Sequence, residues 1–232
     1  MRFHPRPAVA ALLLALGVAV FGMAPPVGAL PAAYSAAEIR GSVVDAETKQ
    51  PLEGVHVVAQ WILQTGVIHG EHIVRLQILE AVTDAAGQYY LPAWGSRARP
   101  PSSRLEWGYD PTLLYFKAGY VQLVRHNYDP PPLNEPDMSE RISVWNGRTI
   151  ELKPFRGTPD TWAGYLSSLQ TGLAWGEHIP IATGPVNDYW KQMPRMVLAI
   201  VEQRNLLPGR LTYLVQDLAV WHVTEAQLRA AQ

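Results

Sequence analysis

Two histidines flank a carboxylate in the segment 64–72, and these residue types could bind a metal ion. His69 and His72, with Glu71 between them, could share a zinc or copper ion. The segment also contains two glycines, which is typical of a hairpin tip, where side chains point to different faces. No third ligand is identifiable nearby in the sequence. We therefore expect a solvated turn here rather than a metal site, and we expect no cofactor.

A second candidate site is a group of aromatic side chains around this hairpin and around the loop 96–111. Its members are Trp61, Trp94, Trp107 and Tyr109. Sugar rings stack on exposed indoles, so a glycan-binding face is one interpretation. The alternative is that these rings pack in a core or against a loop, as tryptophans commonly do.

Several classes of activity find no support in the sequence. The chain contains no cysteine, which excludes thiol catalysis by its own residues. It also lacks the H-E-x-x-H motif of zinc proteases, the G-x-S-x-G elbow of serine hydrolases and a glycine-rich phosphate loop. Its formal net charge of −1 gives no electrostatic reason to expect nucleic acid as a partner.

The first residues predict export from the cytoplasm. Arg2 and Arg6 precede an apolar run at 8–21, and small residues follow up to Ala29. This order is typical of a secretory signal peptide, so we expect residues 1–29 to be cleaved off. The apolar run is shorter than the roughly 20 residues of a membrane span, so we expect no stable membrane span after cleavage. The mature protein is then periplasmic or extracellular.

Short strands with turns between them are predicted from residue 38 to residue 155. Apolar alternation and β-branched residues indicate strands at 39–45, 55–61, 73–78, 88–91, 113–117, 121–125 and 148–153. Two loops, at 96–111 and 127–140, interrupt this series. Many short strands separated by turns are typical of a β-sandwich.

The pattern changes to helices in residues 156–232. Thr158 and Pro159 are suited to the start of a helix whose apolar residues recur up to Leu173, with Gly172 as its expected end. Further helices are expected at 194–206, around 211–218, and after Thr224, which begins a capping box. The link after the last strand is short and contains a proline, so we expect the helices to pack against the sandwich.

An ordered series of motifs resembles a known family. The segments are GSVVD at 41–45, PLEGVHV at 51–57, TDAAGQY at 83–89, LP at 91–92, KAGY at 117–120 and IELKP at 150–154. This series resembles the carboxypeptidase regulatory-like domains, which are transthyretin-like, carbohydrate-binding-like β-sandwiches. The resemblance covers about residues 38–155, and it implies an antiparallel sandwich whose motif residues are structural rather than catalytic. The hairpin extended through 64–72 departs from the family pattern.

Together these observations predict an α+β protein: an antiparallel transthyretin-like sandwich followed by a C-terminal helical region packed against it. We expect an exported, non-catalytic binding or scaffolding module of the periplasm or cell envelope that recognises a glycan or a protein. The alternative is a hydrolase or a metal-dependent enzyme whose site lies between the sandwich and the helices.

Overall fold

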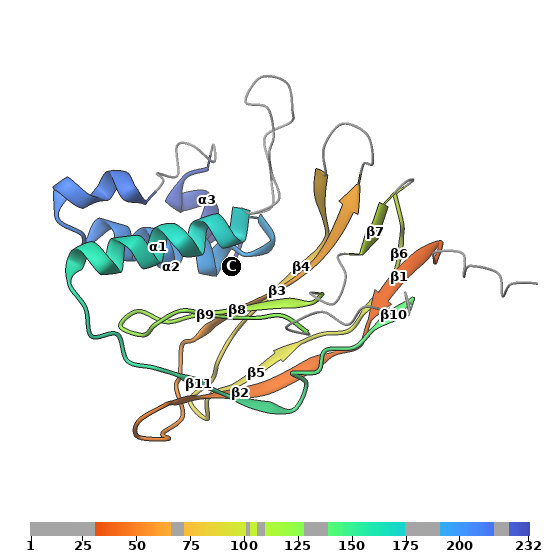
Figure 1. The fold of residues 1–232 in the computed structure, drawn as a ribbon, viewed down its shortest axis with the longest axis horizontal. Helices are drawn as coiled ribbons and strands as arrows, with labels where there is room; N and C mark the ends of the chain where they lie inside the picture. The colour runs from red at the N-terminus through yellow and green to blue at the C-terminus, as the bar shows by residue number, and fades with distance from the viewer. Residues whose placement is uncertain are drawn as a thin grey trace, which may run out of the picture.

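The fold consists of two layers of β-strands followed by one layer of helices (Figure 1). This computed structural model describes residues 31–65, 72–100, 103–105, 110–127, 139–174, 191–215 and 223–232. Strands come first in the sequence and helices follow, which confirms the predicted α+β class. Within the described residues, no helix is both long and apolar enough to span a bilayer. The predicted signal peptide at 1–29 and the hairpin tip at 66–71 lie outside the described residues.

The first layer is built from two three-stranded sheets in the same strand order, β10-β1-β6 and β11-β2-β5. Its strands are β1 (Ala33–Ala36), β2 (Ile39–Asp45), β5 (Gln88–Leu91), β6 (Trp94–Ala98), β10 (Glu140–Arg141) and β11 (Arg148–Leu152). Because β1 leads directly into β2, and β5 into β6, the two sheets follow one another along a single layer (Figure 1).

One edge of this layer departs from the expected antiparallel pairing. Strand β11 runs parallel to β2, with Arg148 opposite Gly41 and Leu152 opposite Asp45, and β10 runs parallel to β1. Parallel neighbours cannot be joined by a tight hairpin. Here the chain forms the strands of the other layer before it returns to β10 and β11, and this long connection lets β10 and β11 run in the same direction as β1 and β2.

The second layer has the strand order β4-β3-β8-β9, and β7 pairs with the far end of β3. Its strands are β3 (His56–Thr65), β4 (His72–Val82), β7 (Ser103–Leu105), β8 (Thr112–Phe116) and β9 (Leu123–Arg125). The antiparallel pair β3–β4 is longer than the sequence indicated, because its strands continue as far as Thr65 and His72. The extended hairpin is therefore continuous β-structure over these described residues.

Strand β3 has a buried side chain on both of its faces. Val57, Ala59 and Trp61 belong to the core between the two strand layers, whereas Val58 belongs to the core beneath the helices. Successive side chains of a strand point to opposite faces, so a strand covered on both sides reads as a continuous apolar run. Every residue of β8 is buried for the same reason.

The helices cover the outer face of the second sheet. They are α1 (Pro159–Ala174), α2 (Pro194–Asn205), the 3₁₀ helix η2 (Gly209–Leu214) and α3 (Glu225–Ala230). Leu166 and Leu169 of α1 and Met196 of α2 share a core with Ile78 and Leu114 of the sheet. Burying each such side chain contributes roughly 1.5–3 kcal/mol, so the predicted packing of helices on the sandwich is strongly favoured.

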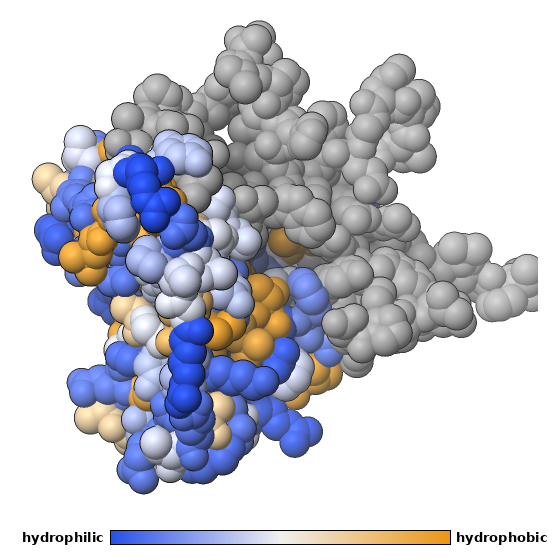
Figure 2. Space-filling model, turned by 60° about the vertical axis from the view of Figure 1, so that its left-hand side comes forward, coloured by the Kyte–Doolittle hydropathy of each residue, from blue (hydrophilic) through white to orange (hydrophobic). Residues whose placement is uncertain are grey.

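Aromatic rings continue this packing toward the link between strands and helices. The ring of Trp162 in α1 stacks on Phe116 at a centroid distance of 6.2 Å and lies 4.9 Å from the ring of Phe155. Figure 2 shows this side of the molecule: hydrophilic residues predominate over its coloured part, and hydrophobic residues reach the surface between the helical layer and the strands below it.

Three local predictions need correction. Helix α1 continues through Gly172 to Ala174 instead of ending at the glycine. The third predicted helix is a short 3₁₀ helix, Gly209–Leu214. The predicted loop 96–111 overlaps strand β6 and contains β7. The capping box at Thr224 is confirmed: its hydroxyl accepts the N–H of Gln227, and the Gln227 side chain accepts the N–H of Thr224.

Candidate functional site

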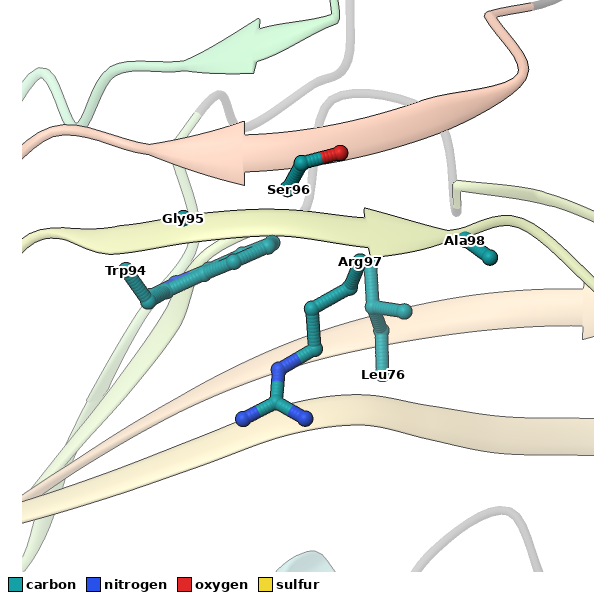
Figure 3. A pocket seen from close by; sticks show the side chains of 6 residues that line it. All are labelled: Leu76, Trp94, Gly95, Ser96, Arg97 and Ala98. Atoms are coloured by element: carbon teal, nitrogen blue, oxygen red, sulfur yellow. The ribbon is translucent and has the colours of Figure 1, made fainter.

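A pocket of about 530 Å³ opens beside strand β6, at the end of the sandwich where the extended hairpin begins (Figure 3). One wall is the whole of β6, and the opposite wall includes a side chain of β4. The described residues that line it are Leu76, Trp94, Gly95, Ser96, Arg97 and Ala98. An edge strand of the first layer and the long hairpin of the second layer therefore position this site.

A β-bulge brings the two large side chains of β6 to the same side. Trp94 lies opposite Ala36 and Arg97 lies opposite Tyr34, so β6 has one residue more than β1 over this stretch. In a regular strand, residues three apart point to opposite faces. The extra residue reverses this relationship, and Figure 3 shows Trp94 and Arg97 both directed toward β4, with Ser96 directed away.

Arg97 lies on the inner face of the sandwich. Its cross-strand neighbour Tyr34 is 1% exposed and belongs to the core between the layers, and directly opposed residues share a face. Yet Arg97 is exposed to solvent, because the layers are open at this pocket. A cation on the inner face of a sandwich, where apolar side chains are the rule, therefore lies at an opening to solvent.

The guanidinium of Arg97 makes no ion pair or hydrogen bond with any described residue, unlike that of its neighbour. The Arg99 side chain donates to the carbonyl oxygens of Pro31 at 2.8 Å and Ser103 at 2.6 Å. The planar donors of Arg97 remain available to a group that enters the pocket. Carboxylate and phosphate are the groups that match this fork of donors.

The two tryptophans of the predicted glycan-binding group that the structure describes are core residues. Trp61 is 1% exposed and Trp94 is 8% exposed, and their rings meet edge to face with centroids 5.4 Å apart. Neither ring lies on an outer surface where a sugar could stack, because both fill the space between the layers, and of the two only Trp94 borders the pocket. Trp107 and Tyr109, the other members of the group, lie outside the described residues.

The indole N–H groups of these two tryptophans are buried, and neither has an acceptor among the described residues. A buried donor without a partner costs about 1–3 kcal/mol. Two such donors lie next to one pocket, so this end of the sandwich has more buried polar groups without a hydrogen-bond partner than a closed core usually has. Such a cost is typical of a region kept for binding rather than for stability.

The structure leaves the predicted metal ligands untested. His69 lies outside the described residues, and His72 begins β4 with a side chain that is also outside them. In the parts of the chain that are described, no cluster of three or more His, Asp or Glu residues could hold a metal ion.

Groups with displaced pKa values lie under helix α2, away from the pocket. Burial lowers the pKa of His56 to about 4, with the positive charges of Arg195 and Lys117 as smaller causes. Burial also raises the pKa of Glu80, although hydrogen bonds from the first turn of α2 act in the opposite direction. Displaced pKa values can mark catalytic groups, but both residues here sit in a packed interface and Glu80 caps a helix.

A buried polar cluster joins β8, β9 and the segment before β11. Asp110 and Arg141 form a bidentate ion pair at 2.7 and 2.9 Å, and both are almost completely buried. Thr112 lies 3.1 Å from Nδ1 of His126, and the Asn127 amide bonds to the backbone of the segment before β11. A carboxylate engaged by both arms of a guanidinium is a poor base, so this cluster holds loops together.

Sequence reasoning did not single out Arg97. The available signal was the length of the predicted loop 96–111, because long loops often carry functional residues. The bulge that turns Arg97 toward Trp94 depends on pairing with β1, a strand that the sequence analysis did not predict. Without that partner strand, the face that Arg97 occupies is not determined.

Comparisons with known proteins identify no family for this chain. No family model matches it. No curated protein matches it either. Among solved structures, the crystal structure of a 9R-lipoxygenase from Cyanothece PCC8801 aligns with 12% identity and a TM-score of 0.25. The alignment covers 87% of this chain but 27% of the lipoxygenase, and so weak a likeness carries no argument about fold or activity.

Proposed function

We propose that this protein is an exported, non-catalytic binding module that holds a carboxylate or similar anionic group of its ligand at Arg97. The observation that carries the proposal is the inward-facing guanidinium, which no described residue pairs, at an open pocket of about 530 Å³. A charged group facing inward between two sheets is costly unless it remains solvated or meets a partner.

The chemistry of the pocket supports binding rather than catalysis. The Arg97 guanidinium has hydrogen-bond donors and no acceptor, so it can bind an anion but does not serve as a base. Trp94 and Leu76 offer apolar surface, and the Ser96 hydroxyl points away from β4 (Figure 3). These groups can fix the orientation of a ligand with one anionic and one apolar part.

The contacts among the motif segments support membership of the carboxypeptidase regulatory-like family for residues of about 38–155. The Thr83 hydroxyl donates to the carbonyl oxygen of Leu52 at 2.6 Å and accepts the N–H of Val55 at 2.8 Å. The Tyr120 hydroxyl donates to the Asp45 carboxylate at 2.9 Å. Segments separated in the sequence thus hold one another together, as structural motif residues should.

The location of the hydrophobic core weighs against the alternative enzyme site between the sandwich and the helices. Val58 and Phe116 of the sheet meet Leu166 and Met196 of the helices in a continuous apolar core. Over the described residues most of this interface is hydrophobic, and Glu80, one of its polar groups, is engaged in capping α2. The resemblance and the predicted signal peptide lead us to place the binding module in the periplasm or cell envelope.

An NMR titration of the mature protein with N-acetylglutamate tests the proposal. We expect millimolar binding with shifts at the amides of β6 and at the Trp94 indole N–H. Arg97→Ala should abolish these shifts, whereas Arg210→Ala, which removes an exposed arginine of the helical layer, should leave them unchanged. Shifts that are absent from the wild type, or that persist in Arg97→Ala, would contradict the proposal.

A further inference from the structure

One edge of β6 has no strand paired with it among the described residues. β6 is the last strand in the order β10-β1-β6, and beyond it the described residues contain no further strand. The side chains of Gly95, Ser96 and Ala98 are small, and all three residues are exposed. Small exposed residues leave the backbone of an edge strand accessible to another chain.

The hydrogen bonds to β1 show which backbone groups face the open edge. The N–H of Arg99 donates to the carbonyl oxygen of Ala32 at 2.9 Å, so Arg99 faces β1. In an antiparallel pair, successive residues direct their N–H and C=O groups alternately toward the partner and away from it. Ala98 therefore presents both of its backbone groups to the open edge.

We propose that β6 binds an extended peptide segment of another protein as an added strand, with an acidic side chain of that segment on Arg97. This inference rests on the proposed function and names the partner class for the same site. Backbone hydrogen bonds to residues such as Ala98 supply affinity that does not depend on sequence. The pocket supplies selectivity, because alternate side chains of the added strand point into it.

Charge complementarity decides the kind of segment. A side chain that enters the pocket meets the guanidinium of Arg97 together with the apolar surfaces of Leu76 and Trp94. A segment with an acidic residue next to an apolar one can pair its carboxylate with the guanidinium and pack its apolar side chain on the rest of the wall. A second copy of this chain fits less well, because pairing two β6 edges would bring two Arg97 cations to one opening.

The geometry of β6 limits the length of the bound segment. The strand extends over Trp94–Ala98, and Pro100 follows shortly after its end. Proline has no N–H and interrupts a ladder of strand hydrogen bonds. The segment that β6 recognises is therefore short, about as long as β6 itself.

The test uses the peptide acetyl-Val-Thr-Glu-Thr-Val-amide and a copy methylated on its backbone nitrogens. We expect the unmodified peptide to bind the mature protein and to slow hydrogen exchange at the Ala98 amide. Methylation should weaken binding about tenfold or more, because the bound strand loses its donors and gains a clash at the edge. Exchange protection at Ala98 distinguishes strand addition from contact through the glutamate alone.

Two variants separate this inference from the proposed function. Ala98→Pro removes the outward N–H and should lose the peptide while it still binds N-acetylglutamate. Arg97→Ala should abolish the binding of N-acetylglutamate and lower the affinity for the peptide. Equal affinity for the methylated and unmodified peptides, absence of peptide binding, or dimers formed through β6 would overturn strand addition. If the wild type does not bind N-acetylglutamate, the proposed function is overturned instead.

Discussion

The carboxylate of Glu80 on β4 accepts the backbone N–H of Met196 in the first turn of α2, at 2.5 Å. It also accepts the N–H of Arg195 at 3.1 Å. The first N–H groups of a helix have no partner within the helix, and an anion at this end is favoured by the helix dipole. Met193, the residue at the N-cap position, provides no side-chain cap. A residue of the sheet thus takes over the capping of a helix that packs on it.

Glu80→Ala should lower the free energy of unfolding by about 1–2 kcal/mol, because it removes this cap and leaves the first N–H groups of α2 partly buried without an acceptor. Urea unfolding followed by circular dichroism measures the change. Glu53→Ala is the matched control, since Glu53 is exposed and only its backbone makes a described contact. A loss as small as that of the control would show that Glu80 does not anchor the helix.

His56 should make the stability of the protein depend on pH. Its folded pKa of about 4 is below the ordinary value of 6.5, so the unfolded chain binds a proton more readily between these values. The contribution of His56 is therefore complete above about pH 6.5 and is lost as the pH falls toward 4. We expect the free energy of unfolding to be about 2 kcal/mol lower at about pH 5 than at about pH 7.

The neighbouring charges define the control for this pH dependence. The positive charges of Arg195 and Lys117 disfavour protonated His56. Glu80 changes the stability in the opposite direction, because its raised pKa lowers the free energy of unfolding as the pH rises above 4.5. His56→Leu should remove most of the loss between about pH 7 and pH 5. If wild type and variant lose the same stability over this interval, the buried histidine is not its source.

Local sequence signals predicted those elements whose determinants are close together in the chain. The capping box at Thr224 needs Gln227, three residues later, and it is present as predicted. The cap of α2 could not be predicted in this way, because Glu80 and Met196 are 116 residues apart in the sequence. Strand β2 is found at the predicted residues Ile39–Asp45, since its alternation and turn are local.

The candidate site was less predictable than the fold for the same reason. The inward direction of Arg97 depends on a bulge in its pairing with β1, and β1 is a short strand without a strong alternating pattern. Tryptophan is common both in binding faces and in cores, so the sequence left both interpretations open. Only the packing of the two layers shows that Trp61 and Trp94 are core residues. Burial is a property of the assembled layers, so composition alone cannot assign it.

Gly87→Ala should destabilise the protein through both conformation and contact. Gly87 has a φ of +71°, and an added Cβ would lie 2.5 Å from the carbonyl oxygen of Val43. Strain of this kind costs about 1–3 kcal/mol, and the close contact adds to it. Gly119→Ala is the matched control, because Gly119 has a φ of +80° and open space around its Cβ. Thermal unfolding should show the larger loss for Gly87→Ala, and equal losses would contradict the contact with Val43.

The buried ion pair between Asp110 and Arg141 should be important for stability. Arg141→Met leaves the Asp110 carboxylate buried without its bidentate partner, which typically costs about 3–5 kcal/mol. The corresponding exposed pair, Arg210 with Asp160, has similar geometry at 3.0 and 3.2 Å. Arg210→Met should cost much less than Arg141→Met, because water solvates the remaining carboxylate of Asp160.

The double variant Asp110→Asn/Arg141→Met separates the charge from the packing of this cluster. Removing the carboxylate charge as well should recover part of the stability lost in Arg141→Met, since an amide is less costly to bury than an anion that has lost its guanidinium. Urea unfolding at neutral pH of the wild type, both single variants and the double variant gives the coupling between the two residues. If Arg141→Met is as mild as Arg210→Met, the Asp110 carboxylate is reached by water and the pair does not hold the chain before β8 against β10.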